Sequence, residues 1–218
     1  MVINDNQRKV IFIHIPKTGG ISVERTIHEA LGGGDVVKFN ELIKIPPRPT
    51  IKTCKGLQIH STMKDYRRYY ENSLSEFYKF SIIRNPWRRM VSHYEYIVNP
   101  TWNKRIHEKN SMEFSTFVQL WKTKMIGYSM KDGYKTFLDD GRGTQLNQII
   151  KLENINEDLP SIGIDIDLEI KEVLYTNSTA QKYKIYENWR DYYNPGLRDR
   201  VYDIFKEDIE KYNYEFEE

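Results

Sequence analysis

A lysine, two hydroxyl side chains and two adjacent glycines lie close together near the start of the chain. They are Lys17, Thr18, Ser22 and the pair Gly19 and Gly20. Adjacent glycines let main-chain N–H groups approach an anion closely, and lysine supplies a compact positive charge. These residue types at this spacing therefore predict a binding site for a phosphate or sulfate group.

The residues on either side predict a strand, a turn and a helix. The apolar run from Val10 to Ile15 is typical of a strand buried in a parallel sheet, and Pro16 ends it. An amphipathic pattern then runs from Ile21 to Leu31. The glycines would therefore lie at the N-terminus of a helix, where unpaired N–H groups and the helix dipole favour an anion.

The order of these residues differs from that of the nucleoside triphosphatase P-loop, in which the lysine follows the glycines. Here Lys17 precedes them. The segment HIPKTGGIS at residues 14–22 resembles instead the 5′-phosphosulfate loop of sulfotransferases, which use 3′-phosphoadenosine 5′-phosphosulfate (PAPS) as the sulfuryl donor. It is most similar to the branch with HIPKTGGTS, which includes many carbohydrate sulfotransferases and soluble bacterial or phage-like members. Ile21 stands where that branch usually has threonine.

The resemblance implies that this loop holds the 5′ end of the donor. Lys17 would stabilise the charge that builds on the bridging oxygen and on the departing 5′-phosphate, so it is implied to be catalytic as well as donor-binding. The residues implied to contact the donor in this loop are Lys17, Thr18, Gly19, Gly20, Ile21 and Ser22.

A second group of residues follows another predicted strand, residues 77–83. Pro86 suits the first turn of a helix, which places Arg84 at the carboxyl end of the strand, where open α/β sheets bind ligands. Ser92 falls about two turns into that helix. A guanidinium and a hydroxyl together can hold a phosphate monoester. The RNPW…S pattern resembles the sulfotransferase 3′-phosphate motif, which implies that Arg84 and Ser92 bind the 3′-phosphate of the donor.

His60 is the candidate general base. It ends a short apolar run and precedes a predicted helix from Met63 to Tyr70, with Ser61 or Thr62 as its cap. Histidine takes a proton from a hydroxyl near neutral pH. The segment resembles a region of bacterial members of the same branch, whose relatives use a histidine or a glutamate as the base. A helix-capping or substrate-orienting role is the alternative for His60.

The chain of 218 residues is long enough to bury one substantial core. Strands and helices alternate along it, which predicts an α/β fold: a single P-loop-like domain over residues 1–218, with a mostly parallel central sheet flanked by helices. No apolar run approaches the roughly 20 residues that a membrane-spanning helix needs, so no transmembrane segment is expected. The N-terminus lacks the apolar core of a secretory signal.

Charge is distributed unevenly between the two halves of the chain. Residues 1–110 contain 19 Lys and Arg against 10 Asp and Glu, whereas residues 111–218 contain 14 against 21. The basic half also carries both predicted phosphate motifs, as a multiply charged donor requires. No nucleic-acid module is recognisable, so a nucleic-acid partner is not expected. Cys54 is the single cysteine, which excludes an intrachain disulfide and favours a reducing, cytoplasmic compartment.

Other segments predict the elements that surround these motifs. Arg88 and Arg89 are interpreted as solvated charges of a helix, with contact to the ligand as the alternative. An amphipathic helix is expected from Ser111 to about Lys124, with its aromatic stripe in the core. A strand from Thr144 to Glu153 precedes a short acidic helix, and Asn194 and Pro195 begin the last helix. Further expectations are a strand at residues 35–39, a loop over the site at 45–55, a polar connection at 99–110 and an acceptor-facing insertion at 127–143. Residues 177–184 resemble a late loop of the sulfotransferase relatives, which implies that this segment closes over the nucleotide.

Together these features predict an enzyme that transfers a sulfuryl group from PAPS to an acceptor hydroxyl. A carbohydrate is the acceptor that the resemblance favours. His60 and Lys17 are the predicted catalytic residues, and no metal ion is expected because no metal-ligand spacing occurs. A P-loop-type kinase or NTPase and a non-catalytic relative that binds a nucleotide or glycan are the alternatives. The donor motifs do not specify the acceptor, and the sequence does not specify the oligomeric state.

Overall fold

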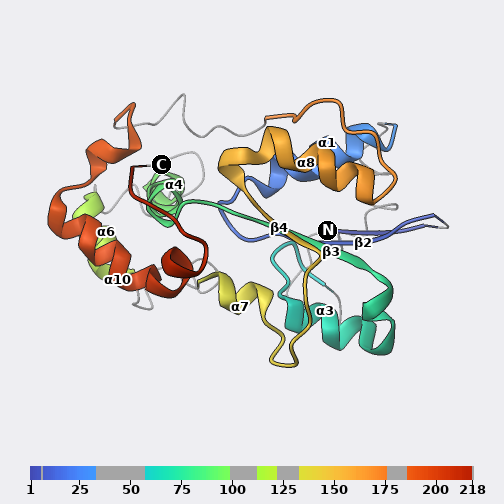
Figure 1. Ribbon diagram of the computed structural model, residues 1–218. Coiled ribbons are helices and arrows are strands. Elements are labelled where there is room, and N and C mark those ends of the chain that lie inside the picture. Colours follow the sequence, from blue (N-terminus) through green and yellow to red (C-terminus); the bar gives the residue numbers. More distant parts are fainter. Residues whose placement is uncertain (6, 33–56, 99–111, 122–132, 176–185, 218) are drawn as a thin grey trace. The chain divides into compact units, whose positions relative to one another are not determined.

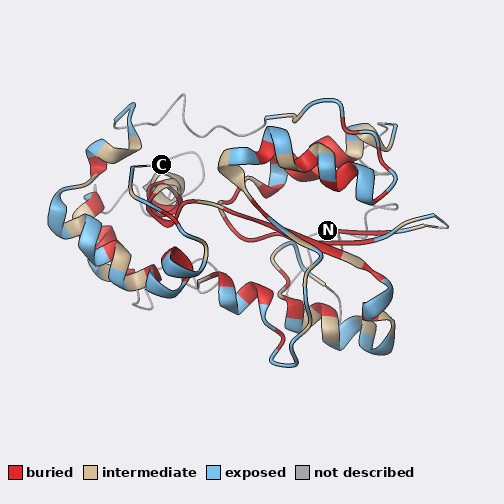
Figure 2. Ribbon diagram, in the orientation of Figure 1, coloured by how far each residue is buried: buried red, intermediate tan, exposed pale blue. Residues whose placement is uncertain are grey.

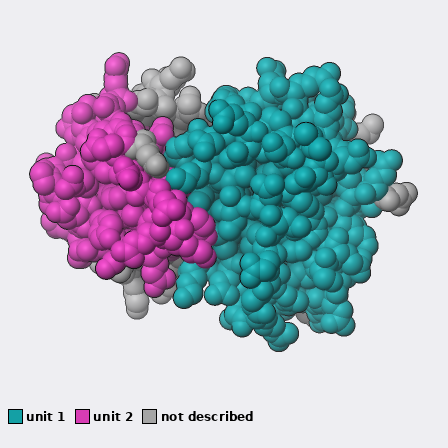
Figure 3. Space-filling model, viewed as in Figure 1, with its two compact units in different colours: residues 1–83, 134–176 teal, residues 84–133, 177–218 magenta. Residues whose placement is uncertain are grey.

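The computed structural model describes residues 1–5, 7–32, 57–98, 112–121, 133–175 and 186–217 (Figure 1). The predictions for residues 35–39, 45–55, 99–110 and 177–184 fall outside this part of the chain. The chain divides into two compact units, shown in different colours in Figure 3. Unit 1 comprises residues 1–83 and 134–176, and unit 2 comprises residues 84–133 and 177–218.

Unit 1 is built on a four-stranded sheet with the order β1-β2-β3-β4. The strands are β1 (Val2–Asn4), β2 (Lys9–Ile13), β3 (Tyr78–Ile83) and β4 (Gln148–Lys151). The pairs β2–β3 and β3–β4 are parallel, and β1 joins the edge of β2 in antiparallel orientation. The predicted α/β class with a mostly parallel sheet is therefore confirmed.

Helices cover both faces of this sheet. α1 (Gly20–Ala30) and α8 (Ile155–Asp165) lie on one face, and α3 (Met63–Tyr70) lies on the other (Figure 1). The 3₁₀ segment η1 (Glu71–Glu76) links α3 to β3, and η3 (Leu152–Asn154) links β4 to α8. The short helix α7 (Tyr134–Leu138) packs against α3. The strand predicted from Thr144 to Glu153 is observed as the shorter β4, and the predicted acidic helix is α8.

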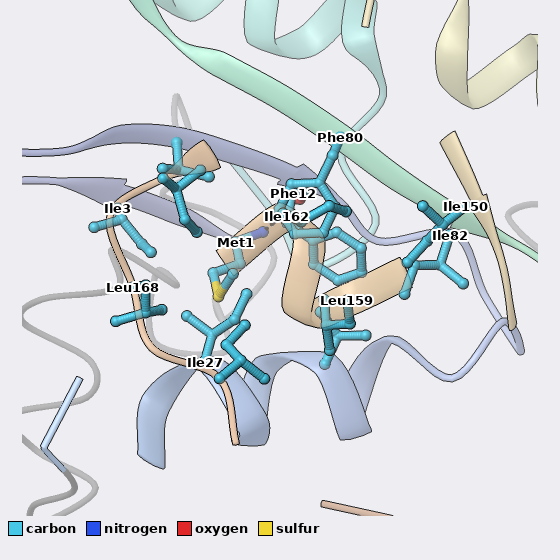
Figure 4. Close-up of a cluster of buried hydrophobic side chains, with 14 of the residues drawn as sticks. Met1, Ile3, Phe12, Ile27, Phe80, Ile82, Ile150, Leu159, Ile162 and Leu168 are labelled. Carbon is cyan, nitrogen blue, oxygen red and sulfur yellow. Dashed lines mark hydrogen bonds between the residues drawn. The ribbon is translucent and has the colours of Figure 1, made fainter. Parts of the chain in front are cut away.

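The core of unit 1 lies between the sheet and the α1–α8 layer. Alternate residues of a strand point to the same face, and Phe12 of β2 and Phe80 of β3 meet there with their rings 4.9 Å apart. Ile27 of α1 and Leu159 of α8 close the cluster from the helical side (Figure 4). In Figure 2 the buried residues, shown in red, accordingly lie along the strands and on the sheet-facing sides of these helices.

The start of α3 matches the sequence prediction. The hydroxyl oxygen of Thr62 accepts a hydrogen bond from the N–H of Asp65 at 3.3 Å, and the Asp65 carboxylate accepts one from the N–H of Thr62 at 2.8 Å. This reciprocal capping box satisfies two main-chain donors that a helix N-terminus otherwise leaves unpaired. It fixes where the helix begins, directly after the segment that carries His60.

Unit 2 is helical in its described part. Its elements are α4 (Pro86–Val98), α6 (Phe114–Leu120), η4 (Trp189–Tyr192) and α10 (Pro195–Lys211), and α4 packs against the other three. Aromatic edges meet throughout its core; for example, the ring of Trp121 contacts those of Phe117 and Phe205 at centroid distances of 5.4 and 5.9 Å. The aromatic stripe predicted for the core is therefore buried.

None of the described helices, in either unit, is both long and apolar enough to cross a membrane.

Two of the helix starts predicted in unit 2, those of α6 and α10, have different outcomes. Asn194 caps α10 as predicted, because its side-chain oxygen accepts a hydrogen bond from the N–H of Leu197 at 2.9 Å. The N-cap of α6 is Glu113 and not Ser111, so that prediction was wrong. The carbonyl of Met112 accepts a hydrogen bond from the Tyr94 hydroxyl at 2.8 Å, and Glu113 is extended, which keeps this part of the chain out of the helix.

Candidate active site

The predicted anion-binding turn joins β2 to α1 in unit 1 (Figure 1). Lys17 and Gly19 both have a left-handed backbone, with φ of 66° and 83°. Gly19 is the N-cap of α1, which begins at Gly20. Left-handed residues that interrupt a right-handed turn direct successive N–H groups into a concavity that binds anions, and the first N–H groups of a helix point the same way. A non-glycine residue such as Lys17 seldom adopts this conformation, and such strain is concentrated at functional sites.

The hydroxyl of Thr18 holds this turn together. Thr18 is fully buried, and its Oγ1 donates a hydrogen bond to the carbonyl of Ile15 at 2.9 Å. The hydroxyl proton is thereby committed to the turn, so the N–H of Thr18 is the group available to donate to an anion. Ser22 is also buried, and its N–H donates to the carbonyl of Gly19 at 2.9 Å, which closes the first turn of α1.

Gly20 is required by the ring of His14, which lies between β2 and the turn. A Cβ atom at position 20 would lie 2.2 Å from both Cδ2 and Nε2 of that ring. His14 is buried, its ring is stacked on that of Phe12, and its Nδ1 is hydrogen-bonded, so the ring has little room to move away. The second glycine of the motif therefore serves the packing of the turn as well as the approach of a ligand.

Gly20→Ala is expected to destabilise the protein by roughly 1–3 kcal/mol, because the new methyl group overpacks a closed site. Gly196→Ala is the matched control, since Gly196 also lies in the first turn of a helix and a Cβ atom there would meet its nearest neighbour at 3.5 Å. That change is expected to be neutral or stabilising by up to about 1 kcal/mol. Urea unfolding measures both. Equal stability of the two variants would contradict the packing assigned to His14.

His60 is positioned by a short turn and by the main chain of His14. The hydroxyl oxygen of Ser61 accepts a hydrogen bond from the N–H of Gln58 at 2.7 Å, and the Gln58 carbonyl accepts one from the N–H of Ser61 at 3.0 Å. The Nδ1 of His60 lies 2.9 Å from the His14 carbonyl oxygen. A carbonyl only accepts, so Nδ1 carries the proton and donates it. In the neutral ring, Nε2 is then the nitrogen that has a lone pair for an incoming proton.

Burial lowers the pKa of His60 from 6.5 to about 4. Repulsion from His14 lowers it further, whereas the hydrogen bond to the His14 carbonyl and the negative charge of Glu24 oppose the shift. The imidazole is consequently neutral near pH 7. A neutral ring with Nδ1 committed as a donor has the protonation state of a general base.

Glu24 is a buried acidic residue that the sequence interpretation did not single out. It lies on α1 at 5% exposure, and its carboxylate accepts a hydrogen bond from Nδ1 of His14 at 3.0 Å. Burial raises the pKa of Glu24, but the hydrogen bond from His14 and the nearby positive groups outweigh this effect and leave the pKa below its ordinary value. The carboxylate is therefore ionised. The sequence signal that could have identified Glu24 is its position beside Val23, within the apolar stripe of the helix.

The second predicted motif begins unit 2. Arg84 follows Ile83, the last residue of β3, and is partly buried, as is Ser92 on α4. Asn85 is fully buried and caps α4, because its side-chain oxygen accepts hydrogen bonds from the N–H groups of Trp87 and Arg88 at 3.1 and 3.3 Å. The cap fixes where α4 begins within unit 2. Pro86 is the first residue of the helix, as predicted.

The interpretation of Arg89 as a solvated charge was wrong. Arg89 is 1% exposed, and its guanidinium lies over the ring of Phe205 at 5.8 Å. A cation placed on an aromatic face is stabilised by the ring quadrupole, so this arginine belongs to the core of unit 2. His93 is likewise buried, with its ring 5.1 Å from that of Trp121. Among the described residues there is no group of three or more His, Cys, Asp or Glu side chains that could hold a metal ion.

A parallel sheet in which a strand leads through a glycine-containing turn into a helix is typical of an α/β protein of the P-loop type. Comparison with family models gives a match to the sulfotransferase family over residues 1–215. The chain therefore belongs to the sulfotransferase family and is an enzyme of sulfuryl transfer.

One solved structure with the same fold is that of mouse sulfotransferase SULT7A1, determined in complex with PAP. The TM-score is 0.54 at 14% sequence identity, and the match covers 95% of this chain and 86% of the mouse chain. No curated protein matches the sequence. The family and the fold inferred from the two motifs are thus confirmed.

Proposed function

We propose that this protein transfers the sulfuryl group of PAPS to a hydroxyl group of a carbohydrate. The assignment of PAPS as the donor is supported by the two motifs and by the fold shared with a sulfotransferase whose structure contains PAP, the spent form of that donor. The carbohydrate acceptor rests on the similarity of residues 14–22 to the HIPKTGGTS branch. A cytoplasmic location, from the single cysteine, completes the proposal.

In this proposal the 5′ end of the donor occupies the turn between β2 and α1. The N–H groups of Thr18 to Ile21 and the ammonium group of Lys17 hold the 5′-phosphosulfate, with Ser22 beside them. Arg84 and Ser92 hold the 3′-phosphate, which distinguishes PAPS from ATP. A guanidinium pairs well with a phosphate monoester because it presents parallel N–H donors.

The transfer is an in-line displacement at sulfur, comparable in its physics to phosphoryl transfer. The acceptor oxygen forms a bond to sulfur as the bond from sulfur to the bridging oxygen breaks, and PAP leaves with that electron pair. Nε2 of His60 takes the acceptor proton. Lys17 and the N–H groups stabilise the charge that develops on the bridging oxygen. The proposal includes no metal ion, because the transferred group carries fewer charges than the end of a triphosphate.

One structural observation carries this proposal: the turn and the base are built on the same residue. The ring of His14 packs against Gly20 of the turn, and the carbonyl of His14 holds Nδ1 of His60 at 2.9 Å. A neutral histidine is therefore anchored to the element that would bind the sulfuryl donor. Proton removal and leaving-group stabilisation need this proximity.

Calorimetry tests the donor assignment. PAP is expected to bind more tightly than AMP, and Arg84→Ala is expected to weaken PAP binding by roughly tenfold to a hundredfold, the equivalent of one charge-assisted hydrogen-bonding group. AMP binding should change little in that variant. Arg200→Ala, at an exposed arginine of α10, is the control. Equal affinity for PAP and AMP, or magnesium-dependent turnover of ATP, would contradict the proposal and favour a kinase or NTPase.

A further inference from the structure

We propose that Glu24 is a positioning residue for sulfuryl transfer, which acts through His14 to hold His60 with Nε2 directed to the acceptor hydroxyl. This inference rests on the proposed function, because it assigns a partner to the proposed base. Its basis is a continuous set of contacts that runs from α1 through the residue after β2 to the segment before α3.

The first contact fixes the ring of His14. Its Nδ1 donates to the Glu24 carboxylate at 3.0 Å, and both side chains are more than nine-tenths buried. A buried ion pair or charge-assisted hydrogen bond is costly to break from one side, because the remaining group has lost its contact with water. The carboxylate therefore determines which way the imidazole of His14 faces.

Two further contacts, both made by His14, orient the ring of His60. The Nδ1 of His60 donates to the main-chain carbonyl of His14, and the two rings meet edge to face at 4.8 Å with an interplanar angle of 84°. The ring of His14 is thus one wall of the space that His60 occupies. A rotated His14 ring would remove that wall and leave the orientation of His60 to the hydrogen bond alone.

The charge of Glu24 adds a second effect. When His60 takes the acceptor proton at Nε2, it becomes an imidazolium in a partly buried place, and the carboxylate favours that positive charge. Glu24 does not take the proton in this scheme. Its role is to orient one imidazole and to stabilise the charge that forms on the next.

Two substitutions separate orientation from charge. Glu24→Gln keeps an oxygen that accepts from His14 and removes the charge, whereas Glu24→Ala removes both. We expect kcat to fall by roughly tenfold in Glu24→Gln and by roughly a hundredfold in Glu24→Ala, with the dissociation constant for PAP unchanged within about threefold. Glu29→Gln, at an exposed glutamate of the same helix, is the matched control and should keep wild-type kcat.

A spectroscopic readout shows whether Glu24 acts on His60 itself. Nitrogen-15 chemical shifts of His60 in the wild type should report a protonated Nδ1 and an unprotonated Nε2 at pH 7. Glu24→Ala should give a mixture of the two tautomers, and Glu24→Gln should keep the wild-type pattern. An unchanged His60 signal together with unchanged kcat in Glu24→Ala would overturn the inference, as would a parallel loss of PAP affinity and kcat in Glu24→Gln.

Failure of this inference is distinguishable from failure of the proposed function. If His60→Ala abolishes sulfuryl transfer while both Glu24 variants retain full kcat, the base is correct and the positioning role is wrong. If the wild-type protein binds AMP as well as it binds PAP, the proposed function itself is wrong. The tautomer of His60 is measured without donor or acceptor, so it tests the contact network in either case.

Discussion

Lys17→Ala is expected to lower kcat by roughly a hundredfold to a thousandfold, the usual cost of removing one preorganised group that stabilises a developing negative charge. Lysine and alanine carry the same Cβ, so the left-handed backbone at φ 66° costs about the same in both. The substitution therefore removes the ammonium group and leaves the turn. PAP should bind several-fold more weakly, because the N–H groups of the turn still hold the 5′-phosphate.

Single-turnover rates with PAPS measure this effect apart from product release. Lys64→Ala, at an exposed lysine of α3, is the control and should keep the wild-type rate. Lys17→Arg should recover part of the lost rate, since it restores the charge with a different donor geometry. A wild-type single-turnover rate in Lys17→Ala would remove Lys17 from the catalytic residues.

The parts of the fold that the sequence predicted well are those determined by neighbouring residues. The helix from Met63 to Tyr70 was predicted with its observed bounds, because a capping residue and a helical pattern are local features. The same holds for Pro86 at the start of α4 and Asn194 at the cap of α10. The turn after β2 was readable for a related reason, since glycine is needed where the backbone turns left-handed.

The features that the sequence did not reveal depend on residues far apart in the chain. Glu24 is meaningful only with His14 across the turn, and His14 only with His60, 46 residues further on. Arg89 has the type and spacing of a surface charge, and its burial follows from Phe205 on another helix. The N-cap of α6 is Glu113 because the hydroxyl of Tyr94 on α4 fixes the carbonyl of Met112. Contacts of this kind need the tertiary structure.

His60→Ala is expected to reduce kcat by a factor on the order of a hundred to ten thousand, the range for loss of a positioned general base. PAP affinity should stay near the wild-type value, because no donor contact is assigned to this side chain. His28→Ala, at a partly exposed histidine of α1, is the control. Turnover in the variant at the wild-type rate would assign the base to another group.

The low pKa of His60 gives the same variant a second signature that needs no substrate. The groups that act on it are His14 after β2, Glu24 of α1 and the amino group of Met1, with burial as the largest cause of the shift from 6.5 to about 4. Between these two pH values the unfolded chain binds a proton at His60 that the folded protein does not. The free energy of unfolding therefore falls as the pH is lowered through this window.

His60→Ala lacks this contribution, so its unfolding free energy should depend less steeply on pH from 6.5 to 4. An identical pH dependence of urea unfolding in the two proteins would show that His60 titrates as it does in water, which is incompatible with the partly buried, neutral base proposed for sulfuryl transfer.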